Sequence, residues 1–219
     1  SVTTSIRRVH PRTLIVLLLT ALMAVSLVSL LIGAGSVGPQ RALALLGGAQ
    51  DSEAQFIVWE LRAPRTLIGI LVGMALGVAG ALLQAVARNP LAEPGLLGVS
   101  AGAAFAVALA LVLGASAATV RISVAQLGAL VGCMCVLSVA RFRGVGNDPI
   151  RLVLAGAAFS GLLASLTSLI LLYDQRAADE IRFWVIGSLA GRRLDDLLAV
   201  LPSMVVAGFV VVLIARPLA

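Results

Sequence analysis

Uncharged apolar stretches alternate with short charged segments along the whole sequence. A helix needs roughly 20 apolar residues to cross a hydrocarbon core of about 30 Å, and each long stretch comes close to that length or exceeds it. The pattern predicts an all-α, polytopic membrane protein with a single transmembrane domain over residues 1–219. The six predicted transmembrane helices cover residues 14–32, 66–87, 96–114, 122–140, 152–173 and 197–215.

The rest of the chain is organised around the second of these stretches. It holds no charge between Thr66 and Ala87; Arg62 and Arg65 precede it, and Arg88-Asn89-Pro90 ends it, since proline stops a helix. At 100° per residue, about a quarter of the helix circumference carries Gly69, Gly73, Gly77, Gly80 and Gln84. Overlapping GxxxG spacings let a neighbouring helix approach closely, so we predict a helix-packing stripe here.

Small residues also recur on three other predicted helices. Gly98 and Gly102 have GxxxG spacing, as do Gly128 and Gly132. One face of the fifth predicted helix carries Ala157, Gly161, Ala164, Ser165 and Ser168. That face is either a contact with another helix or a wall of a polar path, and residue type alone favours the helix contact.

Two longer segments separate the predicted helices. Residues 33–60 are expected to form an outer loop in which Trp59 is an interfacial anchor. Residues 174–196 form a second charged loop, whose apolar part, 181–189, predicts a short helix at the surface. Asp195 and Asp196 are suitable residues to cap the last predicted helix.

Composition supports a membrane protein and argues against an enzyme. The chain is 60% hydrophobic and 12% charged, with a mean hydropathy of +1.09 and a net charge of +6. All 16 basic residues are arginine, which excludes a P-loop lysine and ATP hydrolysis by that route. Cys133 and Cys135 are interpreted as apolar packing residues, and the one histidine, His10, lies in a basic tail. We therefore expect no catalytic residue, no metal site and no cofactor in this chain.

The orientation does not follow from a simple count of positive charges. With the N-terminus inside, each side of the membrane receives eight of the 16 arginines. The predicted inside loops are shorter, however, and hold only two acids, Glu93 and Asp148. Arginine density therefore favours the cytoplasm for both ends of this chain, in a multi-pass protein of the cell membrane.

Three segments closely resemble one family of membrane proteins. LRAPR, then QAVARNPLAEPGLLGVSAGA, then FWVIGSLAGR resemble the permease subunits of type II ABC importers for iron-siderophore, haem and cobalamin, the FecCD-type transmembrane family. The resemblance implies a ten-helix permease that works in homo- or heterodimers, with two cytoplasmic ATPase subunits and an extracytoplasmic substrate-binding protein. It also implies a cytoplasmic N-terminus. Because the family's coupling segment follows an ARPL-like stretch, we expect this chain to hold the six N-terminal helices and to stop before that segment.

The resemblance also implies roles for particular residues. Arg62 and Arg65 are similar to the outside arginines that meet acidic residues of the binding protein; without the resemblance, snorkelling to lipid headgroups would be favoured. The cytoplasmic gate would include Asn89, Leu91, Pro149 and Ile150. The fifth helix resembles the pathway-lining helix, which favours Ser165 and Ser168 as lining residues.

Two other classes of function remain open. One is a structural or assembly membrane protein that transports nothing. The other is a secondary carrier driven by an ion gradient, which would be expected to place an ionisable residue near the membrane midplane. None of the six predicted spans contains one, so the pattern favours a path powered from outside the chain. The sequence does not distinguish a siderophore from haem or cobalamin.

Overall fold

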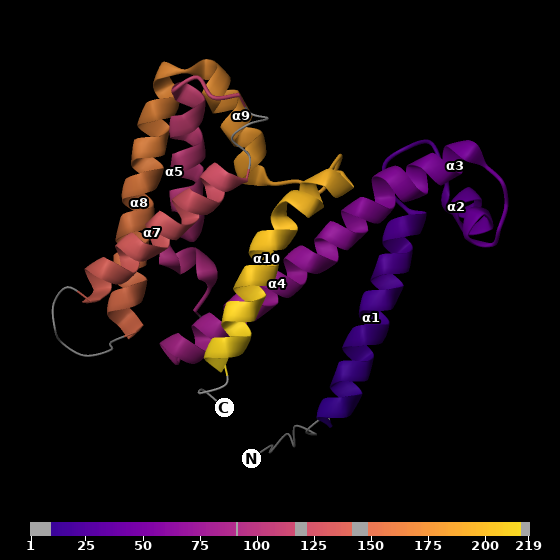
Figure 1. Cartoon of the computed structure of the whole chain (residues 1–219), viewed down its shortest axis with the longest axis horizontal. Helices are drawn as coiled ribbons and strands as arrows, with labels where there is room; N and C mark the ends of the chain where they lie inside the picture. The colour runs from indigo at the N-terminus through magenta and orange to yellow at the C-terminus, as the bar shows by residue number, and fades with distance from the viewer. Residues whose placement is uncertain (1–9, 91, 117–121, 142–148, 216–219) are drawn as a thin grey trace, which may run out of the picture. The chain divides into compact units, whose positions relative to one another are not determined.

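The structure is a computed structural model that describes residues 10–90, 92–116, 122–141 and 149–215. Every regular element in those ranges is a helix (Figure 1), which confirms the predicted fold class. The elements are α1 (Pro11–Leu31), α2 (Pro39–Leu46), α3 (Ser52–Phe56), the π-helical η1 (Ile57–Arg62), α4 (Ala63–Ala87), the 3-10 helix η2 (Pro94–Leu97), α5 (Val99–Val112), α7 (Ser123–Arg141), α8 (Pro149–Tyr173), α9 (Gln175–Ile186) and α10 (Leu194–Ala215).

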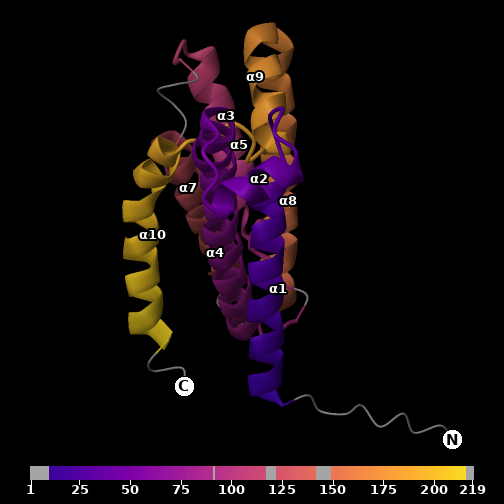
Figure 2. The same cartoon turned by 90° about the vertical axis from the view of Figure 1, so that its right-hand side faces the viewer.

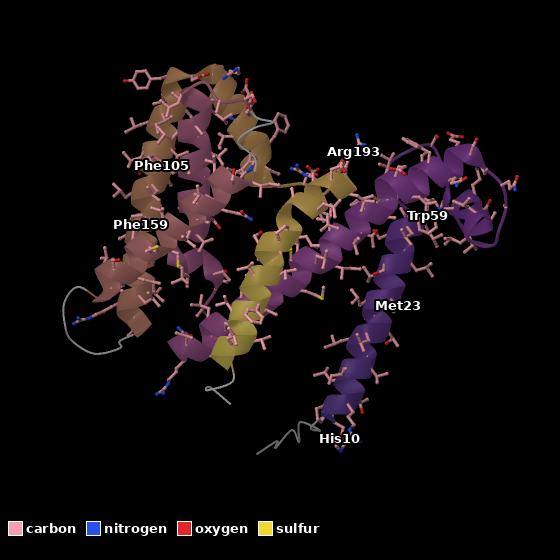
Figure 3. The ribbon with its side chains drawn as sticks, in the orientation of Figure 1. His10, Met23, Trp59, Phe105, Phe159 and Arg193 are labelled. Carbon is pink, nitrogen blue, oxygen red and sulfur yellow. The ribbon has the colours of Figure 1, made fainter. Side chains whose placement is uncertain are left out.

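Five helical stretches in the described part are long and apolar enough to cross a membrane. They are Pro11–Leu31, Ser52–Val86, Ser123–Ala140, Ile150–Tyr173 and Leu194–Leu213. The side chains of α1 project outward around its whole length, as at Met23 in Figure 3, and none of its residues is buried. Such an all-apolar surface is suited to lipid or to another helix rather than to water.

The third predicted helix, 96–114, is shorter than expected. It begins as the 3-10 turn η2, and Gly98 then adopts a left-handed φ of +71° before α5 starts at Val99. Gly114, at φ +91°, lies just beyond the other end. At 1.5 Å per residue the 14 residues of α5 span about 21 Å, less than a hydrocarbon core of about 30 Å. An uncharged stretch alone did not reveal these two interruptions.

The predicted loop over residues 33–60 is mostly helical. The carboxylate of Asp51 accepts from the N–H of Ala54 at 3.0 Å and so caps α3, which continues through η1 into α4 without a break. The second predicted helix therefore starts well before residue 66. The predicted surface helix at 181–189 is instead α9, capped by Asp174, whose side chain accepts from the N–H of Ala177 at 3.1 Å.

Contacts divide the chain into two compact units. The first comprises Ser1–Ile70 with Leu189–Leu197, and the second comprises Leu71–Ser188 with Leu198–Ala219. The core of the first unit contains Val37, Ala42, Ala54, Ile57 and Val58. In the second unit α5, α8 and α9 lie side by side (Figures 1 and 2), and a core forms from Val107, Ala108, Leu111, Ala177 and Ile181.

Glycines bring the helices of the second unit into backbone contact. A Cβ placed on Gly128 would lie 2.5 Å from the carbonyl oxygen of Gly102, and one on Gly132 would lie 2.6 Å from that of Gly98. The predicted GxxxG spacings on α5 and α7 are therefore confirmed as the crossing point of these two helices. Gly156 of α8 lies in the same way against the carbonyl oxygen of Leu96 in η2.

A hydrogen bond also joins α7 to α10. The amide Nε2 of Gln126 donates to Ser203 Oγ at 2.8 Å, and Ser203 Oγ donates to the carbonyl of Val200 at 2.7 Å. Pro202, next to this serine, lies inside α10, which starts at Leu194 rather than at residue 197 as predicted. Both Asp195 and Asp196 therefore lie in the first turn of α10, where negative charge favours the helix N-terminus.

Candidate functional site

Arg62 is buried at the C-terminal end of α1. Its side chain is 1% exposed and is directed into the first unit of the chain. All three guanidinium nitrogens donate to backbone carbonyls: Nε to Ala34 at 3.3 Å, Nη1 to Leu30 at 3.2 Å and Leu31 at 2.8 Å, and Nη2 to Gly33 at 3.4 Å and Val37 at 2.7 Å. A guanidinium carries five N–H groups, so these five bonds use its full donor capacity.

Arg65 lies one turn further along and contacts the same end of α1. Its Nη2 donates to the carbonyl of Ser29 at 2.8 Å, to Ser29 Oγ at 3.1 Å and to the carbonyl of Ile32 at 3.1 Å. The guanidinium also lies against Gly33, where an added Cβ would be 2.8 Å from both Nη atoms. Unlike Arg62, Arg65 is only partly buried.

The two predicted docking arginines therefore have different surroundings. Docking to an acidic partner stays a prediction, but Arg62 in this conformation is buried and uses all its guanidinium N–H groups within the chain. The sequence placed both arginines at one end of a span and could not show which of them points inward. The acceptors of Arg62 are backbone carbonyls, three of them in the segment from Gly33 to Val37, and such carbonyls leave no signal in the residue types.

A second polar cluster, which sequence reasoning missed, joins α2 to α3 in the first unit. Arg41 Nη2 lies 2.7 Å from Asp51 Oδ2 and 3.0 Å from Glu53 Oε2, and Ser36 Oγ donates to Glu53. The N–H of Ala54 and the guanidinium of Arg41 both favour the ionised carboxylate and lower the pKa of Asp51 below its ordinary 3.8. The two carboxylates in turn raise the pKa of Arg41.

This cluster should loosen in acid. A carboxyl group whose pKa is lowered on folding contributes stability that is present above its unfolded pKa and is lost as the pH falls through the folded value. We expect amide exchange at the start of α3, corrected for its intrinsic rate, to accelerate as the pH falls below about 4. The control is Asp51→Asn, which keeps an oxygen for the cap but does not titrate. If amide exchange in that variant accelerates equally as the pH falls, the effect would not be due to Asp51.

The predicted cytoplasmic gate falls on two segments of the second unit. After α4, Arg88 adopts φ +47°, the N–H of Asn89 donates to the carbonyl of Gln84 at 3.2 Å, and that of Arg88 donates to Ala85 at 3.4 Å. This pattern is a Schellman turn with arginine at the usual glycine position. Leu91 lies outside the described residues.

The other gate segment is the start of α8. Pro149 is the first residue of that helix, where proline is favoured, and the side chain of Ile150 is 66% exposed. Six residues further on, Gly156 packs under the Leu96 carbonyl of η2, which follows the Asn89 turn along the chain. One backbone contact thus joins the element after the first gate segment to the helix that begins with the second. The gating role itself stays a prediction.

The two predicted pathway residues lie on an open face of α8. Ser165 and Ser168 are exposed, and each hydroxyl donates to the carbonyl four residues earlier, at 2.9 Å in both cases. Such back-bonding satisfies a hydroxyl in an apolar surrounding. The added Cβ of Gly161, on the same face, would meet no described atom within 4 Å. The geometry leaves both alternatives open, a path wall or a contact with a further helix.

The glycine stripe of α4 is also open over most of its length. Only Gly69 has a close neighbour, the Leu189 side chain at 3.3 Å, whereas added Cβ atoms on Gly73, Gly77 and Gly80 would meet no described atom within 4 Å. Gln84, at the end of the stripe, is exposed. The packing role predicted for this stripe has no counterpart among the described helices and stays a prediction.

The described ranges offer no candidate metal centre. They contain no group of three or more His, Cys, Asp or Glu side chains that could hold a metal ion. The polar groups that do converge are Arg62 and Arg65 on backbone carbonyls and the Arg41 cluster, while glycines bring helix backbones together at the crossings. These are the features of an all-helical, multi-pass membrane protein built for helix packing.

The chain belongs to the FecCD transport family, whose family model matches residues 18–219. It is 44% identical over 202 residues to the ferric enterobactin transport system permease protein FepD of Escherichia coli (strain K12), a match that covers 92% of this chain and 60% of the relative. It is 35% identical to the Fe(3+)-citrate import system permease protein YfmD of Bacillus subtilis (strain 168), over 81% of this chain and 53% of that protein.

Further matches extend the range of substrates named for the relatives. The cobalamin import system permease protein BtuC of Halobacterium salinarum is 36% identical over 74% of this chain and 44% of its own length. A solved structure, described as an inward-facing conformation of a metal-chelate type ABC transporter, superposes with a TM-score of 0.72 at 28% identity and covers 92% of this chain and 61% of that one. The chain thus spans about three fifths of the length of the FepD relative.

Proposed function

We propose that this chain forms part of the permease subunit of an ATP-binding-cassette importer and contributes to the translocation path for an iron-siderophore. The observation that carries the proposal is the 44% identity to a ferric enterobactin permease across 92% of the chain. Haem and cobalamin are the other candidate cargoes, and the name of the Halobacterium salinarum relative includes cobalamin. The six stretches predicted from the sequence to cross the membrane hold no Asp, Glu, Lys, Arg or His, which is consistent with a path powered by a separate subunit.

The proposal includes partners and an orientation. A second permease subunit would complete the path, two cytoplasmic ATPases would power it, and an extracytoplasmic binding protein would deliver the cargo. Both ends of this chain would face the cytoplasm, with the Asn89 and Pro149 segments on that side and the Arg41 cluster outside. Open faces on α4 and α8 support the proposal, because helices of a larger assembly need surfaces on which to pack.

A chimera tests the function in a complete subunit. Residues 18–219 of this chain would replace the matching part of FepD in an E. coli strain that lacks FepD, and uptake of ⁵⁵Fe-labelled ferric siderophores would be measured. We expect uptake above that of the empty strain, which collapses when cellular ATP is depleted. A chimera that inserts stably but takes up no ferric siderophore, haem or cobalamin would favour a structural protein. Uptake that follows an ion gradient rather than ATP would favour a carrier.

The orientation can be tested with single cysteines in a variant whose Cys133 and Cys135 are replaced by alanine. Ala49→Cys and Asp179→Cys occupy exposed positions on the proposed outer side, and Glu93→Cys occupies an exposed position on the inner side. We expect an impermeant maleimide to label the first two in intact cells and the third only after the membrane is opened. Labelling of Glu93→Cys alone in intact cells would invert the topology. Ala178 is unsuitable as a reporter because it is 5% exposed.

A further inference from the structure

Arg62, the last residue of η1, and Arg65, in the first turn of α4, together hydrogen-bond the backbone carbonyls at the end of α1. The last carbonyls of a helix have no partner within the helix, and here six consecutive carbonyls, from Ser29 to Ala34, all accept from guanidinium groups. Arg65 takes those of Ser29 and Ile32, and Arg62 takes the other four. Close to the end of an apolar helix such groups are costly to leave unpaired.

The positive charge of the two guanidinium groups is compensated by the partial negative charge at the C-terminal end of α1 rather than by a carboxylate. Among the described residues, neither Arg62 nor Arg65 takes part in an ion pair, whereas Arg41, Arg182 and Arg193 each pair with a carboxylate. The C-terminus of a helix carries a partial negative charge and favours cations within its last turn. Buried charge at Arg62 is therefore compensated by oriented carbonyl dipoles.

Hydroxyl groups tie the two arginines to each other. Thr66 Oγ1 donates to the backbone carbonyl of Arg62 at 2.9 Å and lies 2.7 Å from Ser29 Oγ, which also accepts from Arg65. The placement of Arg65 thus depends on the same α1 end that Arg62 holds. Toward the described residues, however, Arg65 donates only from Nη2, which leaves the N–H groups of Nε and Nη1 for another acceptor.

We propose that Arg62 is an internal positioning residue, a clasp that fixes the end of α1 and the Gly33–Val37 segment to the helix of Arg65, and that only Arg65 is available to an acidic partner. The first half of this statement concerns the chain alone. The second half rests on the proposed function, because it assigns the acidic partner to the binding protein.

Chemical modification tests the first half on the unaltered protein. p-Hydroxyphenylglyoxal reacts with accessible guanidinium groups, and the modified sites can be located by mass spectrometry after treatment of the protein in its membrane. We expect Arg65 to react together with the exposed Arg193, and Arg62 to react roughly tenfold more slowly until the protein is denatured. If Arg62 in the folded protein is modified as fast as Arg193, Arg62 is not a buried positioning residue and the proposal fails.

Lysine variants compare the two positions at constant charge. A lysine has three donors on one atom and cannot satisfy five spread carbonyls. In detergent, Arg62→Lys should lower the melting temperature by about 5 °C or more, and Arg65→Lys should lower it by less than half as much. Equal shifts at the two positions, or a larger one for Arg65→Lys, would contradict the division of roles. The modification experiment stands even if Arg62→Lys does not fold.

The second half is tested in the chimera with the binding protein of the host uptake system. Exposed charge pairs speed association most at low salt, so Arg65→Gln should weaken binding several-fold at low salt and flatten its salt dependence. Arg62→Lys keeps the charge and loosens the end of α1, so any weakening of binding should be by the same factor at low and at high salt. The reverse result would transfer docking to Arg62. If the unaltered chimera neither binds nor transports, the proposed function fails, while the protection of Arg62 from modification can still hold.

Discussion

Replacing Gly156 by alanine should disrupt the packing of α8 more than any other single methyl group added to that helix. The new Cβ would collide with the backbone carbonyl of Leu96, and a backbone atom cannot turn aside as the end of a flexible side chain can. Over-packing a well-filled contact costs about 1–3 kcal/mol, and we expect the upper end of that range because η2 must move as a whole. The measurement is the loss of melting temperature in mild detergent.

Gly161 provides the matched control for this substitution. It lies on the same helix, and an added Cβ there would meet no described atom within 4 Å. Gly161→Ala should therefore leave the melting temperature within about 1 °C of the unaltered chain or raise it slightly, as alanine favours a helix over glycine. In the uptake chimera, Gly156→Ala should also reduce transport, because the Leu96 contact joins η2, which follows the first proposed gate segment, to the helix that begins with the second. Equal stability of the two variants would show that η2 does not pack on α8.

The positions of the helices could be predicted largely from the spacing of charges. Uncharged stretches identified α1, α4, α7, α8 and α10 because the hydrocarbon core sets a minimum length for a spanning helix. The interruption at Gly98 could not be found in this way, since a glycine in an apolar run is compatible both with a continuous helix and with a left-handed turn. Polar segments such as Ser52–Phe56 were assigned to loops because their helical structure depends on a cap, Asp51, rather than on an apolar face.

The candidate site shows a sharper limit of sequence reasoning. Both Arg62 and Arg65 could be placed at the mouth of a span, but a side chain's partners depend on where the end of a distant helix lies. The acceptors of Arg62 are backbone atoms of residues 25 to 32 positions away, and backbone carbonyls leave no residue-type signal. Glycine pairs are different: their GxxxG spacing predicted that a helix would approach closely, and the structure shows that the pair containing Gly102 meets the pair containing Gly128.

Replacing Gly128 by valine should separate α5 from α7. A Cβ at this position would collide with Ala106 Cβ and lie 2.5 Å from the carbonyl oxygen of Gly102, and valine would add two further methyl groups. Gly132 and Gly102 meet at the same crossing, so the helices cannot slide to relieve the collision without opening the whole contact. We expect a destabilisation of about 3 kcal/mol or more, with aggregation or proteolysis in the membrane.

The result is read as a difference in melting temperature from a matched control. Gly208→Val on α10 is the control for the valine itself, because an added Cβ at Gly208 would meet no described atom within 4 Å. Gly128→Val should lower the melting temperature by about 5 °C or more relative to Gly208→Val. If the two valine variants have the same melting temperature, the α5–α7 crossing does not stabilise the second unit, and the glycines there have another role.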